Sequence, residues 1–493
     1  MKELNGYILI NNKKYPFAFL GEKLKVYPIA DNGDIITKDD KYDELIPGVF
    51  VCKNKMEKAI DEIELNGKLV DGRKITFKVY NDPTEIEGFC TFVVVSVYIY
   101  IPEEKNPIFE EGKANIDEWK VEKNNIDGII ISGREIDFFF NPAEIFEHRY
   151  KLDNGSSRFT EFNVTARQND DENCGKFVLE ENDCKILVGS IAKINEESKT
   201  PFNSYSELVL NFSKNITLEQ VETIIISIQK CFQYLCRRKN IEFSNIETFC
   251  NTENGKRRRV GVYQLNWNRN FEETNPKANS QIIDYKILKT SLGQLVQAFI
   301  NGEMYLNHLP INKDEDRSFG PDRMIFDFVA FEREYQNLYP EIKVRSEAFI
   351  GAKELVLTNI EQLIGAATGK KRKYITSIRN SVSKIENSLG ERIQYVINDC
   401  EDIMKPFLVY NFGKEKYKDD VENMCSKLNQ LRNDCAHGNI AINFDETTLT
   451  DYNTLECLLY AMRLKTLGIS TLEAQRAIAK VMSINMYIPE SSH

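Results

Sequence analysis

The feature that most constrains the fold of this 493-residue chain is a change in the spacing of its apolar residues near residue 280. Up to about residue 215, short apolar runs are separated by turn-forming pairs such as Asn-Asn, Asp-Gly and Asn-Gly. From about residue 284 onward, apolar residues instead recur every three or four positions. The first pattern is typical of strands joined by tight turns and the second of amphipathic helices, so we expect two parts of different fold class.

The first part is expected to be β-rich, as a sandwich or a barrel. Its strand candidates include residues 6–10, 74–79, 128–131 and 207–211. The longest apolar run, residues 92–101, is about half the ~20 residues that a membrane-spanning helix needs, and its β-branched and aromatic residues favour a buried strand. One helix is expected here, over about residues 217–238, because Thr217 and Gln220 have the spacing of a capping box.

The second part is expected to be all-α. Turn residues at 302, 320–321, 365–369 and 412–413 divide it into several helices. The polar stretch over residues 270–281 is the expected linker. The sequence therefore predicts an α+β multidomain chain, with a β-rich sensory or regulatory region over residues 1–280 and a helical domain over residues 281–493.

Composition narrows the classes of function. A net charge of −11 excludes a protein that coats nucleic acid through an overall basic field, so any contact with RNA needs a local basic patch. Eleven cysteines without a C-x-x-C pair indicate reduced thiols. The N-terminus is interrupted by charge and a turn where a signal peptide would be apolar, so we expect a cytoplasmic protein without a membrane segment.

The familiar cofactor and metal motifs are not present in complete form. The segment Gly365–Lys370 resembles a phosphate-binding loop, but it is one residue short and lacks the following Ser or Thr. With only four histidines, a multi-histidine metal site is not expected. We expect no cofactor.

One segment, Leu431–Asn439 (LRNDCAHGN), combines residues that suit catalysis. It follows a predicted amphipathic helix over residues 420–436, whose apolar positions are Val421, Met424, Cys425, Leu428, Leu431 and Cys435. Arg432 is expected to emerge within that apolar stripe, where an unpaired charge is costly. His437 is expected in the last turn, before the helix-terminating Gly438.

The geometry of a helix separates the two side chains. At ~100° per residue, His437 is rotated by roughly 140° from Arg432, so one copy of the helix does not easily aim both at one group. Two copies related by a two-fold axis would bring two arginines and two histidines into one cleft. Such a cleft suits cleavage of RNA without a metal, because histidine moves protons near pH 7 and arginine neutralises the phosphorane.

The pattern Arg432-Asn433-x-x-x-His437 resembles the R-x4-6-H signature of HEPN ribonucleases, which usually has a polar residue directly after the arginine. The layout of a β-rich first half and a helical second half is similar to the ApeA family of bacterial anti-phage proteins, and the segment Gly133–Phe140 is in keeping with the N-terminal domain of that family. By this resemblance, Arg432, Asn433 and His437 are the catalytic residues.

The resemblance also implies a biological role. HEPN defence nucleases act as homodimers with a composite site at the interface and cleave RNA without a metal, leaving a cyclic phosphate. Their target is often tRNA, commonly in the anticodon loop, and its loss causes abortive infection. The β-rich half would then sense a phage-derived trigger, restrain the nuclease or help to select the RNA.

Two further features of the helical half are candidates for the site. Lys370, Lys371, Arg372 and Lys373 form its densest basic cluster and are expected to bind RNA, with a solvated loop between helices as the alternative. Residues 331–335 (FEREY) lie on another predicted helix, where HEPN folds sometimes place an acidic residue near the site. In the first half, the basic run Lys256–Arg259 is interpreted as solvated at the start of a strand.

Two other functions fit the same sequence. In the first, the helical half only dimerises and the β half binds a protein or glycan, so that the chain is a non-catalytic sensor or scaffold. In the second, the chain is an antitoxin-like partner of a nucleotidyltransferase. If the chain is a sensor or scaffold, its function should persist when His437 is replaced. The ribonuclease hypothesis expects RNA cleavage to be lost.

Overall fold

The computed structural model describes residues 3–28, 42–46, 49–52, 61–81, 83–86, 89–102, 125–152, 159–166, 171–194, 202–265, 273–318, 320–340, 347–383, 388–413, 417–436 and 445–489. The chain divides into two compact units. The first comprises Met1–Gln229 with Asn240–Thr274, and the second comprises Lys230–Lys239 with Asn275–His493.

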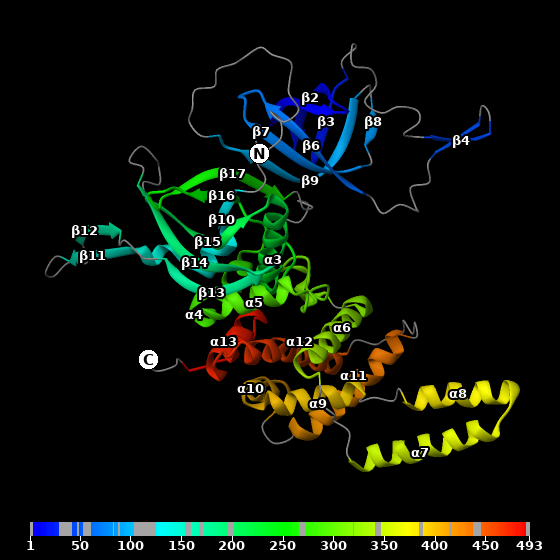
Figure 1. Ribbon diagram of the computed structural model, residues 1–493. Helices are drawn as coiled ribbons and strands as arrows, with labels where there is room; N and C mark the ends of the chain where they lie inside the picture. The colour runs from blue at the N-terminus through cyan, green and yellow to red at the C-terminus, as the bar shows by residue number, and fades with distance from the viewer. Residues whose placement is uncertain are drawn as a thin grey trace. The chain divides into compact units, whose positions relative to one another are not determined.

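The first unit begins with a closed antiparallel barrel, drawn in blue in Figure 1. Its strands follow the order β9-β3-β2-β1-β6-β7, and pairing of β7 with β9 closes the ring. Their bounds are β1 (Leu4–Ile10), β2 (Lys13–Leu20), β3 (Lys23–Val26), β6 (Glu62–Leu69), β7 (Lys74–Tyr80) and β9 (Phe89–Tyr100). Closure removes the exposed sheet edges that would otherwise pair with other chains.

Alternating side chains fill the barrel. In β2, Tyr15, Phe17 and Phe19 are buried, while the residues between them are more exposed. The ring of Phe77 packs edge-on against the rings of Phe17 and Phe19, with centroids 5.2 and 5.3 Å apart. This period-2 burial is the physical basis of the strand pattern in the sequence.

The sheet continues from β9 beyond the barrel, in the order β17-β16-β10-β15-β14-β13. The bounds are β17 (Arg257–Leu265), β16 (Asn245–Asn251), β10 (Ile126–Ser132), β15 (Phe202–Ile216), β14 (Asn182–Ile194) and β13 (Glu172–Leu179). The short strand β8 (Thr84–Ile86) pairs with β9, and two separate hairpins are formed by β4 (Tyr42–Ile46) with β5 (Val49–Cys52) and β11 (Phe146–Leu152) with β12 (Phe159–Ala166). The prediction of a β-rich, barrel-like first half is confirmed.

Two α-helices are described in this part of the chain. Residues Arg134–Phe139 form α2, and Leu218–Cys236 form α3. The side chain of Thr217 accepts a hydrogen bond from the backbone N–H of Gln220, and the side chain of Gln220 accepts one from the backbone N–H of Thr217. This reciprocal pair is the capping box that the sequence indicated.

The basic run of the first half lies at the start of a strand, as interpreted. Arg257, Arg258 and Arg259 are the first residues of β17. Arg257 pairs with Asp171 at 3.5 Å, and Arg259 pairs with Glu247 at 3.0 Å. Both arginines remain exposed, with 36% and 46% of their side chains accessible, so they are solvated as interpreted, although each also forms an ion pair.

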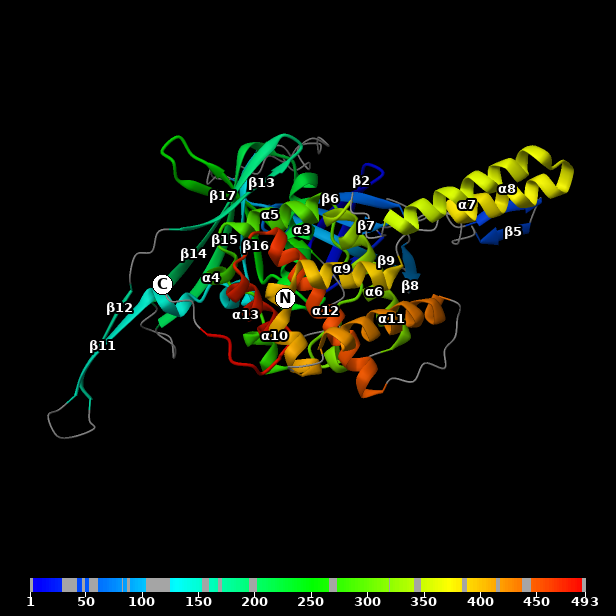
Figure 2. The same ribbon diagram turned by 90° about the horizontal axis from the view of Figure 1, so that it is seen from below.

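The second unit is helical, as predicted. Its helices are α4 (Tyr285–Leu288), α5 (Ser291–Ile300), α6 (Pro321–Leu338), α7 (Glu347–Ala366), α8 (Gly369–Ser383), α9 (Leu389–Asp399), α10 (Glu401–Phe412), α11 (Tyr417–Ala436), α12 (Glu446–Thr466) and α13 (Thr471–Val481). Helix α11 packs against α6 and α9 (Figure 2), and α12 packs against α6 and α10. Among the described residues, no helix has the length and hydropathy needed to cross a membrane.

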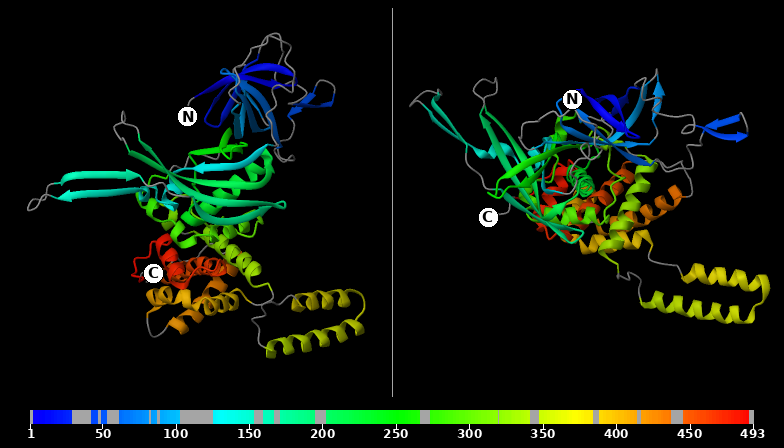
Figure 3. Two further views of the ribbon diagram at one scale, coloured as in Figure 1. Left: turned by 60° about the vertical axis from the view of Figure 1, so that its left-hand side comes forward. Right: turned by 45° about the horizontal axis from the view of Figure 1, so that its top comes forward.

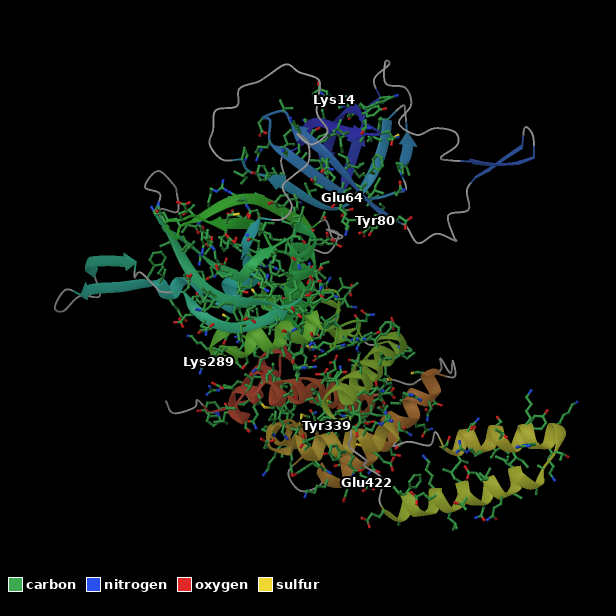
Figure 4. The ribbon with its side chains drawn as sticks, viewed as in Figure 1. Lys14, Glu64, Tyr80, Lys289, Tyr339 and Glu422 are labelled. Carbon is green, nitrogen blue, oxygen red and sulfur yellow. The ribbon has the colours of Figure 1, made fainter. Side chains whose placement is uncertain are left out.

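Three local features fix how these helices meet. Ser388 and Glu391 form a capping box at the start of α9, which sets where that helix begins. A Cβ atom on Gly390 would lie 2.6 Å from the carbonyl oxygen of Cys425, so glycine allows α9 and α11 to approach closely. At the other end of α9, the hydroxyl of Tyr339, labelled in Figure 4, donates a hydrogen bond to Asp399 at 2.7 Å.

Candidate active site

Helix α11 presents the first two motif residues. It runs over Tyr417–Ala436, and Val421, Met424, Cys425 and Leu428 are buried on one face. The predicted amphipathic helix is therefore confirmed. Leu431 and Cys435 are only partly buried, because the last turns of α11 are less covered by neighbouring helices than its middle.

Arg432 lies at the exposed margin of α11, with 44% of its side chain accessible to solvent. The expectation that it sits inside the apolar stripe is wrong, since the covered stripe narrows toward this end of the helix. The guanidinium donates hydrogen bonds to Glu332 Oε1 at 3.3 Å and to Asn433 Oδ1 at 3.2 Å. Arg432 and Asn433 are consecutive in the chain, and both are open to solvent.

Glu332 belongs to α6, a hundred residues earlier in the chain. Pro321 occupies the first turn of this helix, where its lack of an N–H costs nothing. Phe328, Phe331 and Tyr335 anchor α6 in the core, which leaves Glu332 on its flank with 29% of its side chain exposed. Sequence reasoning reached this helix only through the family resemblance, because no local pattern shows that Glu332 faces Arg432.

His437 lies outside the described residues, together with Gly438. The structure therefore places Arg432 and Asn433 but does not place the third motif residue. Helix α11 ends at Ala436, the residue before it.

Buried ion pairs hold α6, the helix that carries Glu332, against α12. Arg463 of α12 donates two hydrogen bonds to Glu334 of α6, at 2.6 and 2.8 Å. Both side chains are almost fully buried. Nearer the start of α6, Arg323 donates to Glu456 of α12 at 2.9 Å, and Glu456 also accepts from Arg237. A charge buried in this way is costly unless it is paired, so these contacts fix the register of the two helices.

Another carboxylate of α12, that of Asp451, lies next to α11. Asp451 is 4% exposed, and its Oδ2 atom lies 4.0 Å from the ammonium nitrogen of Lys427 on α11. Burial raises the pKa of the Asp451 carboxyl to about 6, while the positive charge of Lys427 opposes that rise and the negative charge of Asp445 adds to it. This group changes its charge in a pH range where most carboxylates are already ionised.

The basic cluster predicted to bind RNA lies elsewhere in the same unit. Lys370, Lys371, Arg372 and Lys373 form the first turns of α8 and are exposed. Within the described part of the chain, no hydrogen bond or ion pair joins them to Arg432. They are helical, so the interpretation of the segment as a loop between helices is wrong.

The arrangement suits chemistry on a phosphate. The exposed guanidinium of Arg432 donates hydrogen bonds to Glu332 and Asn433. Its planar set of N–H donors matches the oxygens of a phosphate. No group of three or more His, Cys, Asp or Glu side chains among the described residues is placed to hold a metal ion.

Comparison with known proteins identifies one family domain within the helical part. Residues 328–472 match the family described as Apea-like HEPN. No curated protein and no solved structure matches the chain. The matched span begins within α6 and ends within α13, so it includes Glu332 and the whole Arg432-Asn433-x-x-x-His437 motif. The chain therefore contains an Apea-like HEPN domain at residues 328–472.

Proposed function

We propose that the helical unit is a metal-independent endoribonuclease whose catalytic residues are Arg432, Asn433 and His437. HEPN domains are commonly ribonucleases. The observation that carries the proposal is the placement of Arg432 and Asn433 side by side and solvent-exposed on the last turns of α11, inside the Apea-like HEPN domain. Glu332 holds the guanidinium from the neighbouring helix.

The reaction is an internal transesterification of RNA. An unprotonated His437 takes the proton of a ribose 2′-hydroxyl, and the 2′ oxygen forms a bond to phosphorus while the bond from phosphorus to the 5′ oxygen breaks. The leaving 5′ oxygen then accepts this proton from His437, which leaves a 2′,3′-cyclic phosphate and a 5′-hydroxyl. Arg432 neutralises the phosphorane, and Asn433 orients the phosphate or the histidine by hydrogen bonds.

A homodimer through the helical unit completes the site. If the helix continued through His437, the residue spacing would rotate His437 by roughly 140° from Arg432, and the two side chains of one copy would point in different directions. A two-fold axis beside the end of α11 brings the histidine of one copy toward the arginine of the other. The pocket is then composite and exists only in the dimer.

The substrate is RNA, with the tRNA anticodon loop as the target, and the biological role is anti-phage defence by abortive infection in the cytoplasm. The β-rich unit responds to a phage-derived trigger. These assignments are proposed from the resemblance to HEPN defence ribonucleases, and the Apea-like HEPN domain at residues 328–472 supports them.

The decisive experiment incubates the purified full-length protein with total tRNA in EDTA and maps the ends of any products. The proposal expects cyclic-phosphate ends for the wild type, none for His437→Ala, and wild-type cleavage for the control variant His148→Ala. Cleavage by wild-type protein that disappears on chelation contradicts it.

Phage infection tests the same site with the natural trigger present. Cells expressing wild type or His148→Ala should be protected, while cells expressing equal amounts of folded His437→Ala should not. Protection that persists in His437→Ala would instead support the non-catalytic sensor or scaffold.

A further inference from the structure

Helices α7 and α8 form an antiparallel hairpin, shown in Figure 3, that carries an unusual distribution of charge. The two helices are tied together by a hydrogen bond from Lys353 to the backbone oxygen of Ser383 at 2.9 Å and by an ion pair between Arg379 and Glu361 at 3.1 Å. No residue of either helix is buried. Every side chain of the two helices is therefore at least partly exposed.

The cations of α8 gather at its first turns. The sequence of this helix, GKKRKYITSIRNSVS, contains no acidic residue. Lys370, Lys371, Arg372 and Lys373 are consecutive, so at ~100° per residue they surround the helix instead of lining one face. Among the described residues none of these four forms an ion pair, whereas Arg257 and Arg259 of the other basic run are paired.

An exposed aromatic ring follows directly. Tyr374 is 67% exposed, and Ile378, one turn later, is 55% exposed. Cations beside an exposed aromatic ring are the combination by which proteins bind single-stranded RNA, because the cations bind the backbone and the ring stacks on a base. We call residues 370–374 the basic tip.

We propose that the basic tip is an RNA-binding site, in which Lys370–Lys373 contact the phosphates and Tyr374 stacks on an unpaired base. The inference rests on the proposed function for the identity of the substrate, and it adds a contact that holds RNA apart from the scissile phosphodiester. It predicts that the tip acts on the binding of long RNA and not on the chemical step.

The distribution of charge favours RNA over a protein partner. Cations on all sides of one helical turn match a phosphate backbone that wraps around it, whereas a protein carboxylate meets only one side. The exposed apolar residues Leu355, Val356 and Leu363 lie on α7, and they would serve a docked protein, such as a second copy of the chain. Docking of a second copy on this hairpin is the competing outcome of the test.

The first experiment measures RNA binding in the full chain carrying His437→Ala, so that RNA is not consumed. The probe is a fluorescent tRNA transcript, titrated at several salt concentrations. The variant K370Q/K371Q/R372Q/K373Q should raise Kd by at least about tenfold at moderate salt and reduce the slope of log Kd against log salt by roughly 3. Glutamine keeps a high helix propensity, so α8 should remain folded.

The matched control removes the same number of charges from the other basic run. The variant K256Q/R257Q/R258Q/R259Q should change Kd by less than about twofold. An equal loss of affinity in both variants, or an unchanged Kd and salt slope in the tip variant, overturns the inference.

The second experiment isolates the aromatic ring. Tyr374→Ala should weaken binding of the probe by roughly five- to a hundredfold, and Tyr374→Phe should restore it, because stacking needs the ring and not the hydroxyl. Tyr410→Ala, at another tyrosine that is 60% exposed, is the control and should bind like the parent. Equal binding by Tyr374→Ala and Tyr374→Phe contradicts the stacking role.

The oligomeric state, measured as the mass of the protein in solution, distinguishes docking of a second copy of the chain from binding of RNA. If the tip variants bind RNA normally and Leu355→Ser converts a dimer to a monomer, the hairpin docks a second copy and the inference fails. If RNA binding depends on the basic tip but the wild-type protein cleaves no RNA, the nuclease proposal alone is refuted. If the wild-type protein cleaves RNA but binding does not depend on the basic tip, the present inference alone is refuted.

Discussion

Arg432 and Glu332 form an ion pair, at 3.3 Å, between two helices whose residues are far apart in the sequence. Both side chains are partly open to water, so the pair contributes only about 0–1 kcal/mol to stability. Its consequence is geometric, because the carboxylate holds the guanidinium at the surface of α11. A phosphate that binds Arg432 must compete with Glu332.

Glu332→Gln should therefore strengthen RNA binding. Removing a competitor worth at most about 1 kcal/mol should lower KM by up to roughly fivefold and leave the free energy of unfolding unchanged within about 1 kcal/mol. Steady-state cleavage of tRNA and urea unfolding measure the two effects. A loss of kcat by orders of magnitude with unchanged KM would instead make Glu332 a catalytic group.

The buried pair of Arg463 and Glu334 should dominate the stability of the helical unit. Arg463→Met leaves a buried carboxylate without its partner and should cost roughly 3–5 kcal/mol. The double variant Arg463→Met/Glu334→Leu removes both charges and should recover most of that loss. Urea unfolding of the three proteins measures this, and a double variant as unstable as the single one would contradict it.

Gly390 should be intolerant of a methyl group. Gly390→Ala places a Cβ 2.6 Å from a backbone oxygen of α11, so it should force the helices apart and destabilise the protein by about 1–3 kcal/mol. The control is Gly351→Ala in α7, where nothing lies within 4 Å of the new atom. That substitution should stabilise α7 by up to about 1 kcal/mol. Equal effects of the two substitutions would show that close packing of α9 on α11 is not what requires glycine.

Stability should fall as the pH rises through the range in which Asp451 ionises. The pKa of its carboxyl is raised to about 6 in the folded chain from an unperturbed value near 4, so the folded state holds the proton more tightly than the unfolded state. The resulting stability is present below pH 4 and is lost by pH 6 to 7, with a change of about 2–3 kcal/mol. Asp451→Asn should flatten this part of the pH profile of the unfolding free energy, and an unchanged profile would contradict it.

The elements that could be predicted from the sequence are those with a local cause. The spacing of Val421, Met424, Cys425 and Leu428 indicates α11 because a helix buries every third or fourth residue. The alternation in β2 and the capping box at Thr217 are local in the same sense. The motif residues were found because their type and spacing match a known signature.

The features that could not be predicted depend on contacts between distant segments. Nothing near Arg432 indicates that Glu332 faces it, and nothing near Arg463 indicates that Glu334 pairs with it. The ion pair of Arg257 with Asp171 also joins segments that are distant in the sequence.

The most direct test of the composite site mixes two inactive proteins. Arg432→Ala and His437→Ala are each expected to leave tRNA intact in EDTA. After exchange of subunits, a mixed dimer again has one arginine and one histidine in the shared cleft, and we predict that cleavage returns in proportion to the mixed dimers. A mixture that remains inactive while native mass spectrometry shows mixed dimers would contradict a site built from two copies of the chain.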